Sequence, residues 1–260
     1  MQMVNRLYFL MPSLPPLSLV LRPDLHWQDF LARLALNLPR WAIAKTRVLR
    51  RFVDLCNIRA LFLGDPLDPT GNFAEKELDQ AILIRSDFPQ YVFDFLDQFE
   101  NREEQLRYFP GLLALFFLRE GEKASGFLKR YLAFEREWRL VAAALRAKEY
   151  GKDIVRELQF EDPKDPFIAQ ILAQKDAPQY EPPPEYREIK DVLLSCKGDP
   201  AMEERYFVEY RLRQIDALVG NAQFSLDAVL GYMAKFMLIE AHFALEEEKG
   251  RQLMEKIYAG

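Results

Sequence analysis

Apolar residues recur at helical spacing along almost the whole chain beyond residue 25. The clearest case is the segment 127–148, where apolar positions fall three or four residues apart and so trace one face of an α-helix. These positions are Phe127, Leu128, Tyr131, Phe134, Trp138, Val141, Ala142 and Leu145. The pattern predicts a long amphipathic helix that packs against the rest of the protein on one side.

The segment 225–246 is more apolar still. Its polar positions form only a narrow stripe, made of Asp227, Gly231, Lys235 and His242. A helix of this composition is expected to lie deep, with neighbours on most sides, and Ser225 and Gly250 are suitable residues for its start and its end. From these two segments we expect a core that includes Phe127, Tyr131, Trp138, Leu145, Val229, Met233, Phe236 and Phe243.

Prolines separate the periodic segments from one another and would break the interior of a helix. They are Pro39, Pro66, Pro69, Pro89, Pro110, Pro163, Pro166 and Pro200. The predicted fold class is therefore all-α, a bundle of many helices with weak internal repeats. The exception is the segment 7–17, which is rich in proline and is predicted to be an extended N-terminal segment.

The run Pro182, Pro183 and Pro184 favours extended polyproline II and predicts a linker over residues 177–185. It divides the chain into an N-terminal helical body, residues 1–176, and a C-terminal helical segment, residues 186–260, that packs on the body. The repeats are three stretches in which an acidic residue precedes an aliphatic run and a nearby glycine. They lie at 54–64, 137–151 and 240–250.

Composition places the chain among soluble globular proteins. Half of the 260 residues are hydrophobic, and 35 Lys and Arg face 40 Asp and Glu, a net charge of −5. This acidic balance gives no overall attraction to nucleic acid. The apolar run 112–118 is far shorter than the roughly 20 residues that cross a bilayer, and prolines interrupt the first 23 residues. We therefore expect neither a signal peptide nor a membrane span, and we expect Cys56 and Cys196 to be buried, reduced thiols.

Catalytic chemistry has no visible place in the sequence. It contains two histidines, His26 and His242, and no HExxH, CxxC, GxSxG, GxGxxG or GxxxxGK[ST] motif. His242 is expected to lie on the polar stripe of its helix, and the pair Asp94 and Asp97 is expected to form a solvated helix face. We predict no catalytic residue, no metal ligand and no cofactor.

One cluster of positive charge stands out: Lys45, Arg47, Arg50 and Arg51. Asp54 and Asn57 follow at helical spacing, so a single polar stripe is predicted. It is either an ordinary solvated face or a surface that binds an acidic partner, because like charges at Arg47 and Arg51 disfavour each other unless something acidic is near. If the stripe is exposed and binds a partner, reversing Arg47, Arg50 and Arg51 to Glu should impair assembly without unfolding the chain.

Three stretches resemble a known family: residues 8–15 (YFLMPSLP), residues 134–148 (FEREWRLVAAALRAK) and residues 224–250, in which 229–235 (VLGYMAK) is the most specific piece. They resemble a bacterial family of uncharacterised proteins encoded with vacuolar/archaeal-type (V/A-type) rotary ATPases, and beyond it a divergent form of the C-type connector subunit of those enzymes. The resemblance implies a non-catalytic, all-helical connector between the central shaft and the membrane proteolipid ring. Its partners would be the other ATPase subunits, and its location would be cytoplasmic and peripheral to the membrane.

Two other interpretations stay open at this point. One is a free-standing helical adaptor that binds other proteins and has no link to an ATPase. The other is a small helical enzyme whose carboxylates converge only in three dimensions, which would require a deep polar pocket with strongly perturbed carboxylates.

Overall fold

A computed structural model of the chain describes residues 2–196, 199–221 and 223–259. Across these residues the protein is 71% helical and contains no strand, far above the roughly one-third helix of an average globular protein. The predicted all-α class is confirmed. The α-helices are α1 Gln2–Leu10, α2 Trp27–Asn37, α3 Arg40–Leu63, α4 Glu75–Leu83, α5 Gln90–Asp97, α6 Arg102–Arg107, α7 Phe109–Lys123, α8 Phe127–Glu149, α9 Ile154–Glu157, α10 Pro166–Leu172, α11 Arg187–Ser195, α12 Pro200–Val219 and α13 Leu226–Ala259.

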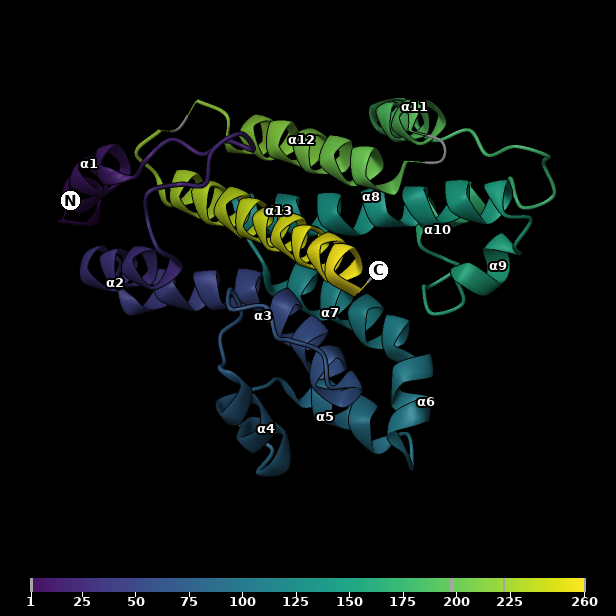
Figure 1. The fold of residues 1–260 in the computed structure, drawn as a ribbon, viewed down its shortest axis with the longest axis horizontal. Helices are drawn as coiled ribbons and strands as arrows, with labels where there is room; N and C mark the ends of the chain where they lie inside the picture. The colour runs from purple at the N-terminus through teal and green to yellow at the C-terminus, as the bar shows by residue number, and fades with distance from the viewer. Residues whose placement is uncertain (1, 197–198, 222, 260) are drawn as a thin grey trace.

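Helix α13 is the centre of the arrangement (Figure 1). It contacts α12 on one side and α3 and α8 on the other, while α7 packs between α3 and α8. The short helices α4, α5 and α6 lie beside α3 and α7, and α9, α10 and α11 lie along α8. The three stretches with the repeated sequence pattern thus belong to α3, α8 and α13, of which α13 contacts the other two.

Five of the eight separating prolines stand at helix starts, as their chemistry predicts, and Pro66, Pro69 and Pro163 lie in loops. Pro39 and Pro89 directly precede α3 and α5, and Pro110, Pro166 and Pro200 lie in the first turns of α7, α10 and α12. Proline has no N–H to donate, and the first turn of a helix is the part where that N–H would have no partner within the helix. These residues therefore separate the helices without weakening them.

The buried side chains form two hydrophobic clusters. The first contains buried residues of α1 to α5, α7, the first half of α8 and much of α13. The second contains buried residues of the second half of α8 and of α9, α10 and α11. Helix α12 contributes to both clusters. Phe127, Trp138, Val229, Met233 and Phe236 are buried as predicted. The other members of the predicted core, Tyr131, Leu145 and Phe243, are only partly buried.

The prediction of an extended segment over residues 7–17 is wrong for its first part. Residues up to Leu10 belong to α1, and a 3₁₀ turn, Met11–Ser13, follows before the chain becomes extended. Leu7 and Leu10 lie one turn apart on α1 and are buried in the first cluster. Prolines begin only at Pro12, so nothing prevents a helix before that residue, and burying the two leucines stabilises it.

The proline-rich stretch 177–185 packs closely against the protein. Tyr180 belongs to the second cluster, and Pro182 and Pro183 are buried. The two clusters meet within α8 and α12 and not at this stretch. The division into residues 1–176 and 186–260 stays a prediction.

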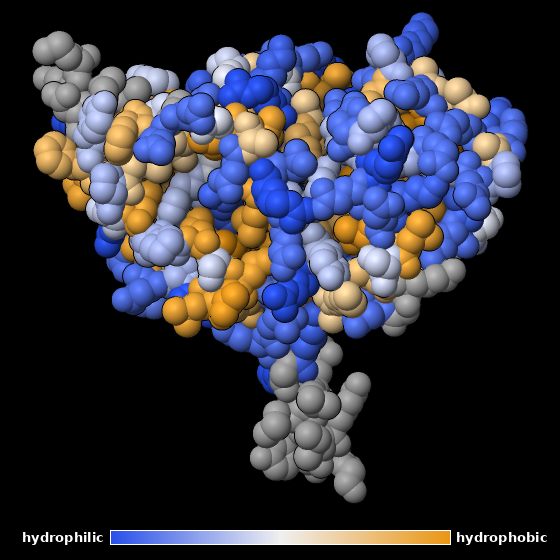
Figure 2. Space-filling model, turned by 90° about the horizontal axis from the view of Figure 1, so that it is seen from above, coloured by the Kyte–Doolittle hydropathy of each residue, from blue (hydrophilic) through white to orange (hydrophobic). Residues whose placement is uncertain are grey.

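One described helix, Leu226–Lys249 within α13, is long and apolar enough to cross a membrane. In the fold, 61% of its most apolar stretch is buried among the other helices, as in the core helix of a globular protein. On the face shown in Figure 2, hydrophobic residues form separate patches between hydrophilic ones.

Candidate functional site

The positively charged cluster lies in the first half of α3 and faces two different environments. The side chain of Arg47 is exposed, and Lys45 is half-buried, with its Nζ 3.1 Å from the Ser125 hydroxyl and 6.0 Å from the centre of the Trp41 ring. Arg50 and Arg51 are also half-buried, but both are bound within the protein. Of the four predicted partner-binding residues, Lys45 and Arg47 are therefore the ones a partner could engage at little cost to the fold.

Arg50 binds the loop between α3 and α4. Its Nε donates to the Thr70 carbonyl at 2.9 Å, and its Nη2 donates to the Gly71 carbonyl. Burial lowers the pKa of Arg50, although the charge of Asp54 opposes this. Arg50 thus forms part of the structure of the loop.

Arg51 binds the neighbouring helix α7. Its Nη1 is 2.7 Å from Oε1 of Glu120, a buried carboxylate that also accepts a hydrogen bond from the Tyr91 hydroxyl at 3.2 Å. The acidic group that the sequence predicts near Arg51 is therefore supplied by the chain itself. Glu120 and Tyr91 could not be identified from the sequence, because 69 residues separate Arg51 from Glu120.

The polar stripe is not a solvated face in its second half. Asp54 and Asn57 are only 1% and 2% exposed, respectively. Asn57 donates from Nδ2 to the Asp68 carbonyl and accepts from the Asp68 N–H, each at 2.9 Å. Asp54 accepts bonds from the backbone and the side chain of Asn72. The two side chains therefore hold the loop 65–73 against α3.

Asp54 is the carboxylate to consider if the protein is an enzyme. Both of its oxygens accept hydrogen bonds from Asn72. Burial raises the pKa of Asp54, while the hydrogen bonds from Asn72 and the charge of Arg50 act in the opposite direction. A perturbed carboxylate in a hollow is a common sign of catalysis. Here burial beneath the loop accounts for the raised pKa, and both carboxylate oxygens already accept hydrogen bonds from Asn72.

A polar hollow of about 180 Å³ lies beside this stretch of α3. It is lined by Arg47, Arg50, Arg51, Asp54, Asn72, Phe73 and Asp87. Arg51 is already paired with Glu120 and Arg50 is bound to the loop, so the exposed Arg47 is the guanidinium that offers its charge to a partner here. A carboxylate side chain of a partner would find charge complementarity here.

The other candidate residues stand apart from this hollow. Asp94 and Asp97 are exposed, as expected, and Asp97 pairs with Arg85 at 2.6 Å. His26 is exposed, whereas His242 is buried with its Nδ1 3.1 Å from a Glu204 carboxylate oxygen. Over the described part of the chain, no group of three His, Cys, Asp or Glu residues could hold a metal ion. Cys196 is a buried free thiol, as predicted. The prediction that Cys56 is buried is wrong, because this free thiol is only partly buried in the wall of a hollow.

The fold and this hollow define an all-helical protein in which two buried polar residues of α3, Asp54 and Asn57, hold the following loop against the helix. The chain belongs to the family described as "Protein of unknown function (DUF2764)", whose model matches residues 3–260. It is 27% identical to an uncharacterized protein of Chlamydia muridarum and 26% identical to one of Chlamydia trachomatis serovar D, with 99% of each chain covered. An uncharacterized protein of Chlamydia pneumoniae is 26% identical over 98% of both chains. No solved structure matches the chain.

Proposed function

We propose that the chain is a non-catalytic connector of a V/A-type rotary ATPase, similar to the C-type connector subunit and placed between the central shaft and the membrane proteolipid ring. The observation that carries the proposal is the packing of the segments that bear the resemblance. Helix α13, which holds residues 229–235, contacts α8. The hydroxyl of Tyr232 also donates to the Pro15 carbonyl at 2.9 Å, which ties in the opening segment. These contacts join the three segments, with α8 and α13 in the interior of the fold and the opening segment at its edge.

A connector that passes torque has to be stiff, and the centre of this fold has the packing that stiffness requires. Phe236 on α13 lies with its ring centre 5.4 Å from that of Trp27 and 5.5 Å from that of Phe30. Closely packed interiors of this kind have low compressibility and transmit strain. Long helices that share such a core can move as one body under load.

The surface proposed to meet an acidic partner is the exposed part of the α3 cluster, Lys45 and Arg47. Reversal of exposed charges changes folding free energy little, typically by no more than about 1 kcal/mol. Reversal at a complementary interface replaces attraction by repulsion and weakens assembly far more. Reversing Arg50 and Arg51 as well would not separate an effect on assembly from an effect on folding. The triple reversal suggested by the sequence would break the bonds of Arg50 to the loop and of Arg51 to α7.

The test is affinity purification of the tagged chain from native membranes. We expect the shaft and ring subunits to co-purify, and we expect the Lys45→Glu/Arg47→Glu variant to lose them while keeping its melting temperature. Arg187→Glu, at an exposed position of α11, is the matched control and should retain them. Purification without any ATPase subunit would overturn the connector and favour a free-standing adaptor. Full retention by the double variant would leave the connector but overturn the assignment of Lys45 and Arg47.

A further inference from the structure

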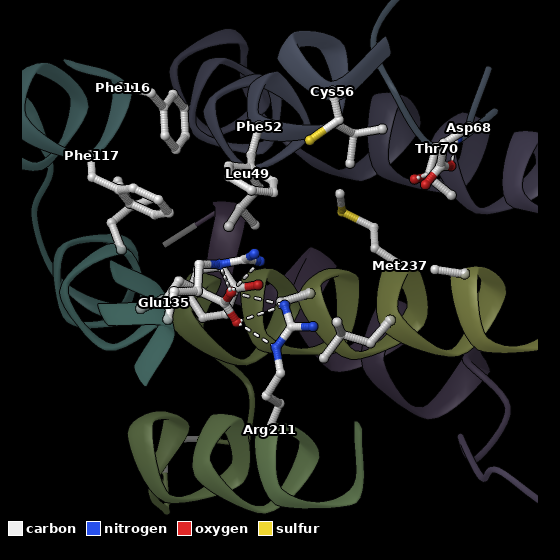
Figure 3. Close-up of a pocket in the computed structure, with 17 residues that line it drawn as sticks. Leu49, Phe52, Cys56, Asp68, Thr70, Phe116, Phe117, Glu135, Arg211 and Met237 are labelled. Atoms are coloured by element: carbon white, nitrogen blue, oxygen red, sulfur yellow. Dashed lines mark hydrogen bonds and ion pairs between the residues drawn. The ribbon is translucent and has the colours of Figure 1, made fainter. Parts of the chain in front are cut away.

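A second hollow lies on the other side of α3 and is mostly apolar (Figure 3). It has a volume of about 200 Å³ and is enclosed by side chains from α3, α7, α8, α12 and α13. Its apolar wall includes Leu49, Phe52, Phe116, Phe117 and Met237. An apolar cavity of about 150 Å³ is already large enough to bind benzene. This cavity therefore has room for a small organic molecule.

One end of the cavity is formed by three charged side chains. Glu135, which is buried, accepts from Nε and Nη2 of Arg211 at 2.9 and 2.8 Å, and from Nη2 of Arg139 at 3.0 Å. Arg139 also donates from Nε at 3.3 Å, and Trp138 adds a fifth N–H to the same carboxylate at 3.2 Å. Among the described residues, Glu135 is the one acidic partner of both arginines. This end of the cavity thus carries two positive charges against one negative charge.

Glu135 and Arg211 each hold the other in its charged form. Burial by itself would raise the pKa of Glu135, but Arg211 and Arg139 outweigh it and hold the pKa below its usual value. Burial would lower the pKa of Arg211, and the charge of Glu135 outweighs that in turn. Two guanidinium groups share one carboxylate at this end of the cavity, so an anion placed against them would complete the charge balance.

Arg139 is the group best placed to meet that anion. Arg211 binds both oxygens of Glu135 and its side chain is 14% exposed, whereas Arg139 donates from Nε and Nη2 to a single oxygen of Glu135 and its side chain is 35% exposed. Its guanidinium carbon is 4.5 Å from the centre of the Phe52 ring and 5.1 Å from that of Trp138. These aromatic contacts hold the guanidinium in position before any ligand arrives, which reduces the entropy lost on binding.

The other end of the cavity has the opposite character. Asp68 lines it, and one of its carboxylate oxygens accepts from the backbone N–H and the hydroxyl of Thr70 at 2.8 and 2.7 Å. Figure 3 shows Asp68 and Thr70 well away from the charged triplet, with Met237 between the two ends. A bound anion would therefore be directed to the Arg139 end, and an apolar chain would extend along the middle of the cavity.

We propose that this cavity binds a small organic anion, a carboxylate joined to a short apolar chain, with the carboxylate against Arg139. The apolar walls recognise the chain through the area that binding removes from water. The surplus guanidinium charge recognises the carboxylate by charge-assisted hydrogen bonds. The proposal does not depend on the ATPase role and concerns a different face of α3.

The test compares octanoate, octanol and octylammonium, which share one alkyl tail and differ in the charge of the head group. Binding is measured by titration calorimetry and by protection of Cys56, a partly buried thiol in the cavity wall, from a small alkylating reagent read out by mass spectrometry. We expect octanoate to bind at one saturable site and to protect Cys56, and we expect the other two compounds to bind at least about tenfold more weakly.

Two variants locate the site. Arg139→Gln should weaken octanoate binding by about tenfold or more while the protein stays folded, because Arg211 still pairs with Glu135. Ala241→Trp, at an exposed position in the lining, should block entry. Arg205→Gln, in an exposed pair outside the cavity, is the matched control and should bind octanoate normally. The proposal is overturned if octylammonium or octanol binds as tightly as octanoate, if Arg139→Gln binds unchanged, or if octanoate shows no saturable binding with a dissociation constant below the order of 1 mM.

Discussion

Arg51 on α3 and Glu120 on α7 form an ion pair, with 2.7 Å between Nη1 and Oε1, and it fastens the charged stripe to the interior of the protein. Replacing Arg51 by Met leaves a buried carboxylate whose remaining partner is the Tyr91 hydroxyl. We expect the free energy of unfolding to fall by about 2–3 kcal/mol, because an unpaired buried charge is costly. Urea denaturation measures it.

Arg119→Met, also on α7, is the control for that experiment. Arg119 pairs with Glu122 at 3.7 Å, and both side chains are about half exposed. Its replacement should cost less than about 1 kcal/mol. Equal losses in the two variants would contradict a structural role for the pair of Arg51 and Glu120.

Gly71 lies in the loop 65–73, where the loop comes close to Asp54 and Asn57 of α3. A Cβ atom at this position would stand 2.8 Å from both Asn57 Nδ2 and Asp54 Oδ1. We expect Gly71→Ala to destabilise the protein by about 1–3 kcal/mol, because either the loop or the side chains of Asp54 and Asn57 have to shift. Gly121→Ala, in α7 with open space around the new methyl group, should instead stabilise by about 0.5–1 kcal/mol. Opposite signs in thermal denaturation are the expected result; a neutral Gly71→Ala variant would show that the loop is not held closely.

Phe236 tests the core that the hydrophobic pattern predicts. It is 0% exposed, with aromatic contacts to Trp27, Phe30 and Tyr232. Phe236→Ala should cost about 3–5 kcal/mol in the free energy of unfolding. Phe9→Ala is the control, because Phe9 is 79% exposed and its loss leaves no cavity. This variant should change the free energy of unfolding by no more than about 0.5 kcal/mol. A loss below about 1 kcal/mol at Phe236 would mean that α13 is not the centre of the fold.

The sequence predicts the helices well because period and proline placement are local signals. The segment predicted over 127–148 is α8, Phe127–Glu149. The segment predicted over 225–246 begins α13, but the predicted end at Gly250 is wrong, because the helix continues to Ala259. The prediction of an extended segment over residues 7–17 was wrong for the residues up to Leu10. The prolines correctly indicate that no α-helix continues after Leu10, but they say nothing about the residues before them, which form α1. What holds α1 is the burial of Leu7 and Leu10 against distant parts of the chain, and no local pattern contains that information.

The candidate site shows the same limit. Helical spacing correctly places Arg47, Arg50, Asp54 and Asn57 on one stripe, but spacing cannot tell a solvated stripe from one covered by a loop. Asp54 and Asn57 are covered, and the signal that could have indicated this is the stretch 64–72 after α3, rich in Gly, Asp, Asn and Pro and able to approach a helix closely. The triplet of Glu135, Arg139 and Arg211 was missed because Arg211 lies 76 residues from Glu135.

Glu135 provides a prediction on pH. Burial raises the pKa of this carboxyl, but Arg211 and Arg139 together hold it below the value of 4.5 that it has in an unfolded chain. A carboxyl whose pKa is lower in the folded state adds stability that is present above the unfolded pKa and is lost as the pH falls through the folded pKa. We therefore expect the free energy of unfolding to fall with pH below about 4.5, in part through Glu135.

In Glu135→Gln this contribution is absent, so the variant should be less stable than the native protein near neutral pH, and the gap between the two should narrow as the pH is lowered below about 4.5. Urea denaturation across this range measures both slopes. Glu100→Gln, at an exposed position, is the control and should keep the native slope. If the gap between Glu135→Gln and the native protein stays constant with pH, Glu135 does not carry a lowered pKa. The surplus charge at the end of the cavity would then have to be reconsidered, because it depends on Glu135 being ionised beside two guanidinium groups.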